Sequence, residues 1–483
     1  MSVYSGLLLD AAFKAFAAGR RDHAETVLRL AAGAGDKDAH ILYFLGHLYH
    51  LWGRYDDAAW FLTAALTIDP NHARAHNDLG ETLRHQGHIE DAVPHLERAI
   101  ALEPSLAHPY GNLAAALVAL DRPKDALRRA QESLRRSTGK ATAHCDMGSV
   151  FGRLNRTKEA IRQYGLALEL DPGNPHAHYF RGLMRLTLGD IPDAWADHEA
   201  RLVLQGLRYP AETHWTGQQD LTGRTILLYD EQGLGDTIQF IRYVPMIQAL
   251  GAAVLIEVQR GLGSLCAANF RQVFEAGDTL PAFDLHCPMM SLPAALGTTF
   301  GSMPANVPYL AADPAIHADW SHTLGVWRKM RVGLAWSGNT LHAADRGRSM
   351  ALAVLTPLLN RTDIAWHAIQ RDIRDTDRLA MPGFPGLVDH SAALTDFSQT
   401  AALIASMDLV ISVDTAVLHL AGALNVPAWA MLAHSADWRW MRDRDDSPWY
   451  PSLRLFRQKQ HGDWSPMIEQ IGENLGQWAI SRG

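Results

Sequence analysis

The sequence lacks paired cysteines, long apolar runs and an excess of positive charge. Its three cysteines, Cys145, Cys266 and Cys287, have neither disulfide nor metal-binding spacing, so we expect a reducing compartment and a cytoplasmic location. No window approaches ~18 uninterrupted apolar residues, which predicts no membrane span. The N-terminus indicates an amphipathic helix and not a signal peptide. The net charge of −8 argues against a nucleic-acid-binding surface.

Several catalytic signatures are missing as well. The sequence has no Walker loop, no nucleophile elbow, no H-E-x-x-H motif and no cluster with metal-ligand spacing. We therefore expect neither a bound metal nor a cofactor. Apolar sequence is abundant: 47% of the 483 residues are hydrophobic, which is enough for roughly two to four folded domains.

Small residues recur through the first two hundred residues at a period of 34 (46 − 12, 80 − 46). One series is Ala12, Gly46, Gly80, Ala114, Gly148 and Gly182, and a second is Ala24, Ala58, Ala92, Ala126, Ala160 and Ala194. A partial third series is Pro70, Pro104 and Pro172, with Thr138 interrupting it. Each unit holds two amphipathic segments joined by a turn, and a proline ends the second. This pattern is identified as the tetratricopeptide repeat, in six units over residues 1–206.

Such repeats stack into an all-α superhelix with a concave groove. The residues expected to line this groove are His40, Tyr43, His47, Asn77, Glu81, His108 and Gly111. We expect the groove to bind a protein or peptide, and such an array is compatible with a homo-oligomer. One register of the repeat is filled by His76, Tyr110, His144 and His178. A position that accepts either ring is typical of core packing, so we do not interpret these histidines as metal ligands.

A linker follows at residues 207–220, where Pro210 and the Thr216-Gly217 turn mark a domain boundary. Just before it, Trp195, His198, Glu199 and Arg201 are placed to fix the repeats to the next domain. Beyond it, apolar runs alternate with helical patterns, which predicts parallel sheets with right-handed crossovers. The runs are Ile226–Tyr229, Ala253–Val258, Val332–Trp336, Ile364–Ile369, Leu409–Val413 and Ala428–Leu432. The predicted fold is thus α followed by α/β, with two doubly wound lobes at 221–315 and 325–475.

The first predicted strand ends in a glycine-rich corner. Gln232, Gly233 and Gly235 allow a tight turn and a close backbone approach. Asp236 stands at the start of the next helix, where a carboxylate is a good cap. Glu231 and Asp236 flank a loop at the carboxyl end of a strand, where open α/β sheets bind ligands. The simpler alternative is an ordinary helix cap.

Three loops of the second lobe follow predicted strands. The first holds Ser337, Gly338 and Asn339, then His342, Arg346 and Arg348, and its arginines could clamp phosphates. The second holds Gln370. The third runs from Asp414 through Thr415, Ala416 and Val417 to His419, and the free N–H groups of its helix start favour a diphosphate. The alternatives are a solvated charged loop for each arginine and packing for His419.

With these residues in view, the C-terminal half resembles two-lobed glycosyltransferases of the B fold, and most of all family nine, the heptosyltransferase-related group. The matching stretches are QGLGDTIQFIRYVP (232–245), VGLAWSGN (332–339) and DLVISVDTAVLHLAGALNVPAWAML (408–432). The resemblance makes Asp236 the catalytic base. This chain has Ala416 where heptosyltransferases have glycine, and Arg346 or Arg348 in place of their phosphate-contacting lysine. Repeats joined to such a domain are similar in plan to the O-linked N-acetylglucosamine transferases.

The resemblance implies an inverting, metal-independent transfer from a nucleotide sugar to a protein or glycan acceptor selected partly by the repeats. It places the acceptor-side loop at residues 231–235. A second interpretation is a non-catalytic adaptor whose α/β half is a structural remnant. A third, a nucleotide-sugar epimerase fold, needs a G-x-G-x-x-G fingerprint, and Gly233-Leu234-Gly235-Asp236-Thr237-Ile238 lacks its last glycine.

Overall fold

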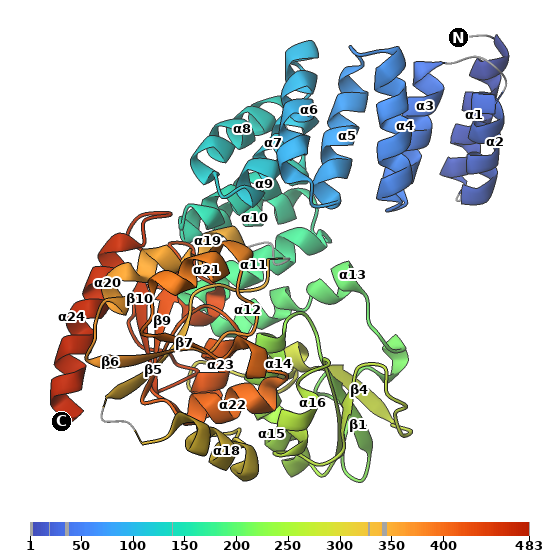
Figure 1. The fold of residues 1–483 in the computed structure, drawn as a ribbon. Coiled ribbons are helices and arrows are strands. Elements are labelled where there is room, and N and C mark those ends of the chain that lie inside the picture. The colour runs from blue at the N-terminus through green and yellow to red at the C-terminus, as the bar shows by residue number, and fades with distance from the viewer. Residues whose placement is uncertain are drawn as a thin grey trace. The chain divides into compact units, whose positions relative to one another are not determined.

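The computed structural model describes residues 3–18, 20–33, 38–137, 139–326, 329–340 and 345–482. By compactness the chain divides into two units, Met1–Ala177 and His178–Gly483. The first contains only helices among its described residues, and the second contains two parallel sheets with helices between the strands (Figure 1). The α and α/β classes expected for the two halves are confirmed.

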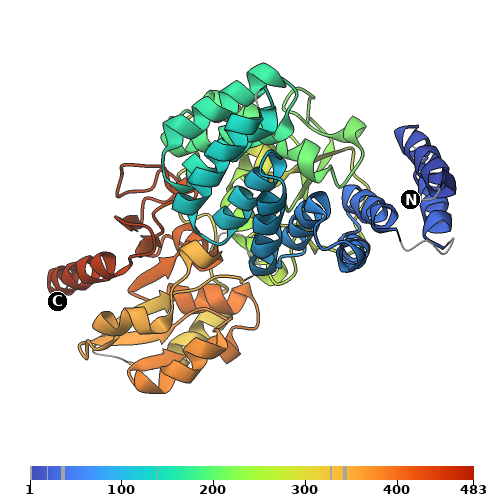
Figure 2. The same ribbon diagram turned by 90° about the horizontal axis from the view of Figure 1, so that it is seen from above.

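The first unit is a series of antiparallel helical pairs that follow one another in chain order (Figures 1 and 2). Its helices are α1 (Val3–Ala17), α2 (Arg21–Gly33), α3 (Ala39–Leu51), α4 (Tyr55–Ile68), α5 (Ala73–His85), α6 (Ile89–Leu102), α7 (His108–Ala119), α8 (Pro123–Arg136), α9 (Ala141–Arg153) and α10 (Thr157–Leu170). Pro70, Pro104 and Pro172 each lie two residues beyond the end of a second helix, as expected of residues that cannot continue one.

The periodic small residues mark where the two helices of a pair touch. A Cβ on Gly46 would lie 2.6 Å from Leu62 Cγ, and a Cβ on Gly80 would lie 2.6 Å from Leu96 Cγ. The second series lies on the second helix of each pair and is equally buried: Ala24, Ala58, Ala92, Ala126, Ala160 and Ala194 are all 0% exposed. Close packing therefore leaves no room for larger side chains at these positions.

Polar contacts join the first helix of one pair to the first helix of the next pair. His47 Nδ1 lies 2.7 Å from Asp78 Oδ2, the Asn77 amide donates to Asp78, and the Asn112 amide donates to Asn77. Glu81 is paired with Arg84 on the same helix. Among the residues expected to line the groove, His47 and Asn77 share Asp78 as a partner, whereas Tyr43 and Gly111 are buried.

The histidine register bonds one helix of a pair to the other. His76 Nδ1 lies 2.9 Å from His95 Nδ1, and His144 Nδ1 lies 2.8 Å from Gln163 Oε1. In the last pair His178 Nδ1 lies 2.7 Å from Asp197 Oδ1. Each partner follows its histidine by 19 residues (95 − 76, 163 − 144, 197 − 178). The register therefore ties the two helices of a pair together, as the packing interpretation expects.

The last helical pair belongs to the second unit by its contacts. It consists of α11 (Pro175–Leu188) and α12 (Ile191–His198), and the short α13 (Arg201–Gln205) follows. The Trp195 indole N–H donates to the Thr298 carbonyl at 3.1 Å, and Arg201 donates to Ser291 at 2.7 Å. These are the residues expected to fix the repeats to the next domain. Because they pack on the first lobe, compactness divides the chain after residue 177, whereas the repeat pattern runs on to 206.

The first lobe contains a four-stranded parallel sheet in the order β3-β2-β1-β4. Its elements are β1 (Thr225–Tyr229), α14 (Leu234–Phe240), α15 (Val244–Ala249), β2 (Ala253–Val258), α16 (Gly263–Ala267), β3 (Val273–Glu275), β4 (Leu285–Pro288), α17 (Leu292–Ala295) and α18 (Pro314–Leu324). Helix α18 ends at Leu324, and the following residue, Gly325, adopts a φ of +65°.

The second lobe contains a six-stranded parallel sheet in the order β10-β9-β8-β5-β6-β7. Its elements are β5 (Met330–Ala335), α19 (Asp345–Arg348), α20 (Thr356–Leu359), β6 (Ile364–Ala368), α21 (Asp375–Ala380), β7 (Leu387–Asp389), α22 (Phe397–Ala405), β8 (Leu409–Val413), α23 (Ala416–Ala423), β9 (Ala428–Leu432), β10 (Leu453–Arg457) and α24 (Ser465–Arg482). The strand order reverses between β5 and β8, which defines the switch point of a doubly wound sheet.

Candidate active site

The candidate site lies at the carboxyl edge of the second sheet, where the neighbouring strands β5 and β8 end. The chain leaves β5 towards β6 on one side and leaves β8 towards β9 on the other. Ligands of open α/β sheets bind at such a switch point. The loop after β5 and the loop after β8 carry most of the residues that the sequence singles out in this lobe.

The loop after β5 is held by Gln370 from the end of β6. Gln370 Oε1 accepts the Trp336 N–H at 2.7 Å, and its amide donates to Ser337 Oγ at 2.9 Å. The Gly338 N–H donates to Ser349 Oγ at 3.0 Å. Gln370 and Ser337 were both expected to contact the donor, but these polar atoms hydrogen-bond within the loop and hold it in place. Gly338 faces the site.

Arg348 crosses from the loop after β5 to the loop after β8. Its Nη1 donates to the Asp414 carbonyl at 3.1 Å, and a Cβ on Gly338 would lie 2.9 Å from its Nη2. No carboxylate in the described part of the chain forms an ion pair with this guanidinium, and its buried Nε has no acceptor there. A half-buried arginine with donors to spare is suited to an anion.

Helix α23 starts beside this guanidinium. Thr415 is its N-cap residue and Ala416 its first residue. The N–H groups at a helix start have no partner within the helix and carry the positive end of its dipole. Thr415, Ala416 and Val417 therefore present backbone donors next to Arg348, as expected from the sequence.

His419 packs one turn further along α23, against the first lobe. A Cβ on Gly235 would lie 2.9 Å from His419 Cδ2 and 3.5 Å from Ala416 Cα, so the first turns of α14 and α23 touch. The His419 Nδ1 lies 2.9 Å from the Tyr450 hydroxyl, and its Nε2 lies 3.9 Å from Asp414 Oδ1. Burial holds the pKa of His419 well below its usual range, so the ring is neutral.

Burial raises the pKa of the Asp414 carboxyl to about 6, and the negative charge of Asp437 contributes to the rise. The guanidinium groups of Arg348 and Arg439 act in the opposite direction. Because a neutral Asp414 can donate a hydrogen bond while a charged one only accepts, this position can adapt to an anionic ligand.

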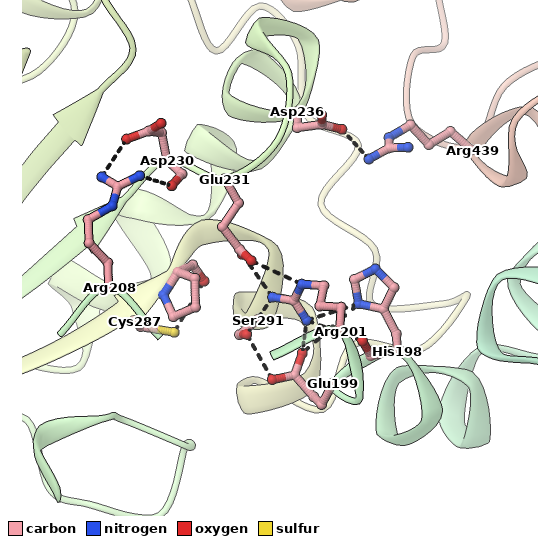
Figure 3. A network of polar contacts seen from close by, with 11 residues as sticks. His198, Glu199, Arg201, Arg208, Asp230, Glu231, Asp236, Cys287, Ser291 and Arg439 are labelled. Atoms are coloured by element: carbon pink, nitrogen blue, oxygen red, sulfur yellow. Dashed lines mark hydrogen bonds and ion pairs between the residues drawn. The ribbon is translucent and has the colours of Figure 1, made fainter. Parts of the chain in front are cut away.

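Asp236 reaches the site from the first lobe, where it is the third residue of α14. Its Oδ2 accepts the Gly233 N–H at 2.8 Å, which closes the helix cap. Its Oδ1 is ion-paired with Arg439 from the loop after β9 (Figure 3). Both carboxylate oxygens are thus engaged, and the pair joins the two lobes.

Arg439 was not singled out from the sequence. It is 6% exposed, donates to Asp437 Oδ1 at 2.9 Å and to the Gln239 side chain, and lies 4.4 Å from the Trp438 ring centroid. The signal that could have identified it is positional. The run Ala428–Leu432 is a strand of the same parallel sheet, so the loop that follows it lies at the same sheet edge as the loops after β5, β6 and β8.

Glu231 belongs to a different cluster, on the other side of the same glycine-rich loop (Figure 3). Arg201, which is 0% exposed, donates to both Glu231 oxygens at 3.2 and 2.8 Å and also to Glu199. Ser291 completes the cluster by donating to Glu199 at 2.8 Å. Both oxygens of Glu231 are therefore engaged by Arg201, the first residue of α13.

Other predicted residues lie apart from this centre. Asn339 and Arg346 are exposed on the loop after β5, and Gln232 is exposed on the loop after β1. His342 lies outside the described residues. A hollow of about 450 Å³ opens elsewhere in the unit, between Leu188, Phe300 and Met441.

No group of three or more His, Cys, Asp or Glu side chains among the described residues is placed to hold a metal ion. Among the same residues, no helix combines the length and the apolar character that crossing a membrane requires.

Comparison with known families supports both halves. Residues 382–463 match glycosyltransferase family 9 (heptosyltransferase), a segment that includes Asp414, His419 and Arg439 but neither Asp236 nor Arg348. Residues 53–94, 107–132 and 145–205 match tetratricopeptide repeat models.

A curated relative, protein FlbA of Caulobacter vibrioides, is 28% identical over 335 residues, which cover 63% of this chain and 55% of FlbA. The chain thus spans about half the length of the curated relative that it matches. Solved structures similar to it include TTC0263, a thermophilic TPR protein of Thermus thermophilus (20% identity, TM-score 0.33, 38% of this chain and 99% of that one). Another is pilF of Pseudomonas aeruginosa (18% identity, TM-score 0.36, 42% and 92%). The chain therefore combines N-terminal segments that match tetratricopeptide repeat models with a C-terminal segment that matches the model of glycosyltransferase family 9.

Proposed function

We propose that this chain is a glycosyltransferase that moves a sugar from a nucleotide sugar to a protein or glycan acceptor. The observation that carries the proposal is the pairing of Arg348 with the start of α23 at the switch point of the second sheet. There a guanidinium without a carboxylate partner among the described residues stands beside free helix N–H groups. This combination suits the diphosphate of a nucleotide sugar.

In the proposed reaction, the acceptor hydroxyl attacks the anomeric carbon while Asp236 takes its proton. The bond from that carbon to the phosphate oxygen breaks, and its electrons leave on the nucleoside diphosphate. Arg348 and the N–H groups of Thr415, Ala416 and Val417 stabilise the charge that develops on the leaving group. A direct displacement of this kind inverts the anomeric centre and needs no metal or cofactor. The repeats are proposed to select the acceptor.

A thermal-shift screen with UDP, GDP, ADP and CMP tests the donor site. A ligand that binds only the folded state raises the melting temperature, and we expect one of the four to do so. Arg348→Gln should reduce that shift, whereas Arg346→Gln, which changes an exposed arginine of the same loop, should not. Once the nucleobase of the donor is identified, Asp236→Ala should lower the rate of sugar transfer by at least tenfold. This factor corresponds to about 1.4 kcal/mol of activation barrier. A smaller loss would remove Asp236 from the role of base.

A second function, a non-catalytic adaptor, is favoured by one observation. Both oxygens of Asp236 are engaged, one by Gly233 and one by Arg439. Neither oxygen of such a carboxylate is free to take the proton of an acceptor hydroxyl. A well-folded sample that shifts with none of the four nucleotides would favour the adaptor and move attention to the repeats.

A further inference from the structure

We propose that Arg439 is a ligand of the donor diphosphate, and that it restrains Asp236 until the diphosphate takes its place. This inference rests on the proposed function and adds to it the residue that couples donor binding to the release of the base. In the ligand-free protein Asp236 serves as the counter-ion of Arg439. When the donor is bound, its phosphate oxygens provide that negative charge.

The position of Arg439 allows the diphosphate to replace Asp236 directly as its partner. It is buried between the lobes, on the loop after β9, and pairs with Asp236 from α14. The residue next to Asp236, Gly235, touches α23 at Ala416 and His419. The residue next to Arg439, Trp440, has its ring centroid 5.2 Å from that of His419. The guanidinium therefore lies beside the same helix start that Arg348 approaches from the opposite loop.

The charges at this point also favour exchange. The Asp437 and Gln239 side chains hold Nη1 and Nε of Arg439, so the guanidinium stays in place when Nη2 changes its partner. Asp236 keeps its bond from the Gly233 N–H and remains at the helix start. A diphosphate brings more negative charge than one carboxylate, and arginine binds such oxygens through two donors at once. Donor binding thus moves only one hydrogen-bonding partner and leaves both loops where they are.

The exchange determines the order of events. Asp236 accepts the proton of the acceptor hydroxyl, the acceptor oxygen bonds to the anomeric carbon, and the nucleoside diphosphate leaves with the electrons of the broken bond. Arg439 now faces the phosphate oxygen on which this charge develops, where a buried cation is most effective. Without donor the same cation is paired with Asp236 Oδ1, the oxygen that would otherwise be open to the acceptor hydroxyl.

The test measures the affinity of the nucleoside diphosphate selected by the thermal-shift screen, and that of its nucleoside, in four folded variants. Arg439→Gln should weaken binding of the diphosphate by tenfold or more and leave the affinity for the nucleoside within twofold of wild type. Asp236→Asn should tighten the diphosphate by threefold or more, because it removes the competing charge. Arg444→Gln is the matched control, since this arginine lies in the same loop but pairs with exposed Asp446, and should change neither affinity.

Arg439→Lys keeps the positive charge and provides a second test if Arg439→Gln fails to fold. Its expected result is an intermediate loss of diphosphate affinity. Unchanged diphosphate affinity in a folded Arg439 variant, or weaker binding by Asp236→Asn, would overturn the inference while the proposed function stands. If the wild-type protein bound no nucleoside diphosphate, both would fall together. A purely structural ion pair predicts no gain of affinity in Asp236→Asn, so that gain separates the two roles.

Discussion

Replacing Arg201 with methionine should destabilise the α/β unit strongly. Methionine fills much of the same volume but donates no hydrogen bond, so Glu231 and Glu199 lose their shared cation. Glu231 is 9% exposed and cannot regain water, whereas Glu199 is 28% exposed and can in part. The cost therefore comes chiefly from Glu231. Breaking a buried pair in this way costs about 3–5 kcal/mol.

The loss is measurable by urea unfolding followed through tryptophan fluorescence. Of the 14 tryptophans only Trp52 and Trp60 precede residue 178, so this signal reports mainly on the α/β unit. A thermal melt should show a decrease of about 6–20 °C, from roughly 2–4 °C per kcal/mol for a unit of this class. Arg454→Met is the matched control, because Arg454 is exposed and bonds only the Asn474 side chain among the described residues.

The loss of stability in Arg201→Met should change with pH in a characteristic direction. Burial already raises the pKa of Glu231, and Arg201 opposes that rise. Without Arg201 the folded-state pKa rises further above its unfolded value, so the variant loses stability as pH increases through that range. The difference from wild type should be smallest near pH 4.5 and largest near pH 7. A loss below about 1 kcal/mol, or one that does not change with pH, would refute the assignment of the cost to an unpaired Glu231.

Two further predictions concern packing and titration elsewhere. Gly80→Ala should destabilise the repeats by about 1–2 kcal/mol, because overpacking outweighs the gain in helix propensity, and the same substitution should cost less in a Leu96→Ala background, as measured by circular-dichroism melts. His367 is 1% exposed, and burial beside His390 lowers its pKa to about 4. The unfolded chain therefore binds a proton that the folded one does not, so stability should fall by up to about 1.4 kcal/mol per pH unit below pH 6.5, and His367→Asn should flatten that slope in urea titrations.

The fold follows from the sequence in its central parts and less well at its edges. Runs that are mostly or wholly apolar, such as Leu409–Val413 and Ala428–Leu432, coincide with buried strands. The four strands that the sequence does not single out, β3, β4, β7 and β10, are the edge strands of the two sheets. An edge strand has only one neighbour and can be short or partly polar. β10 illustrates this with Arg454 exposed between buried leucines.

The site follows from the sequence only where backbone chemistry decides it. The helix start at Thr415 is visible as a polar turn after an apolar run, and the structure has it there. Side-chain partners between distant segments are not visible in this way. Arg439 meets Asp236 across 203 residues, and Arg201 meets Glu231 across 30. Nothing local distinguishes these arginines from solvated ones, because their burial depends on how the lobes and the last helical pair pack.

The two sheets place different chemistry at equivalent positions. Both have a strand order that reverses beside the first strand of the lobe, β1 in one and β5 in the other. At the first reversal the facing groups are Glu231 and Ser291, and Arg201 satisfies both. At the second they are Arg348 and the start of α23, whose donors are not used up within the described chain. A crevice filled by the chain's own charges offers a ligand little, so the proposed anionic ligand is expected at the second sheet. In the proposed function the first lobe then contributes Asp236.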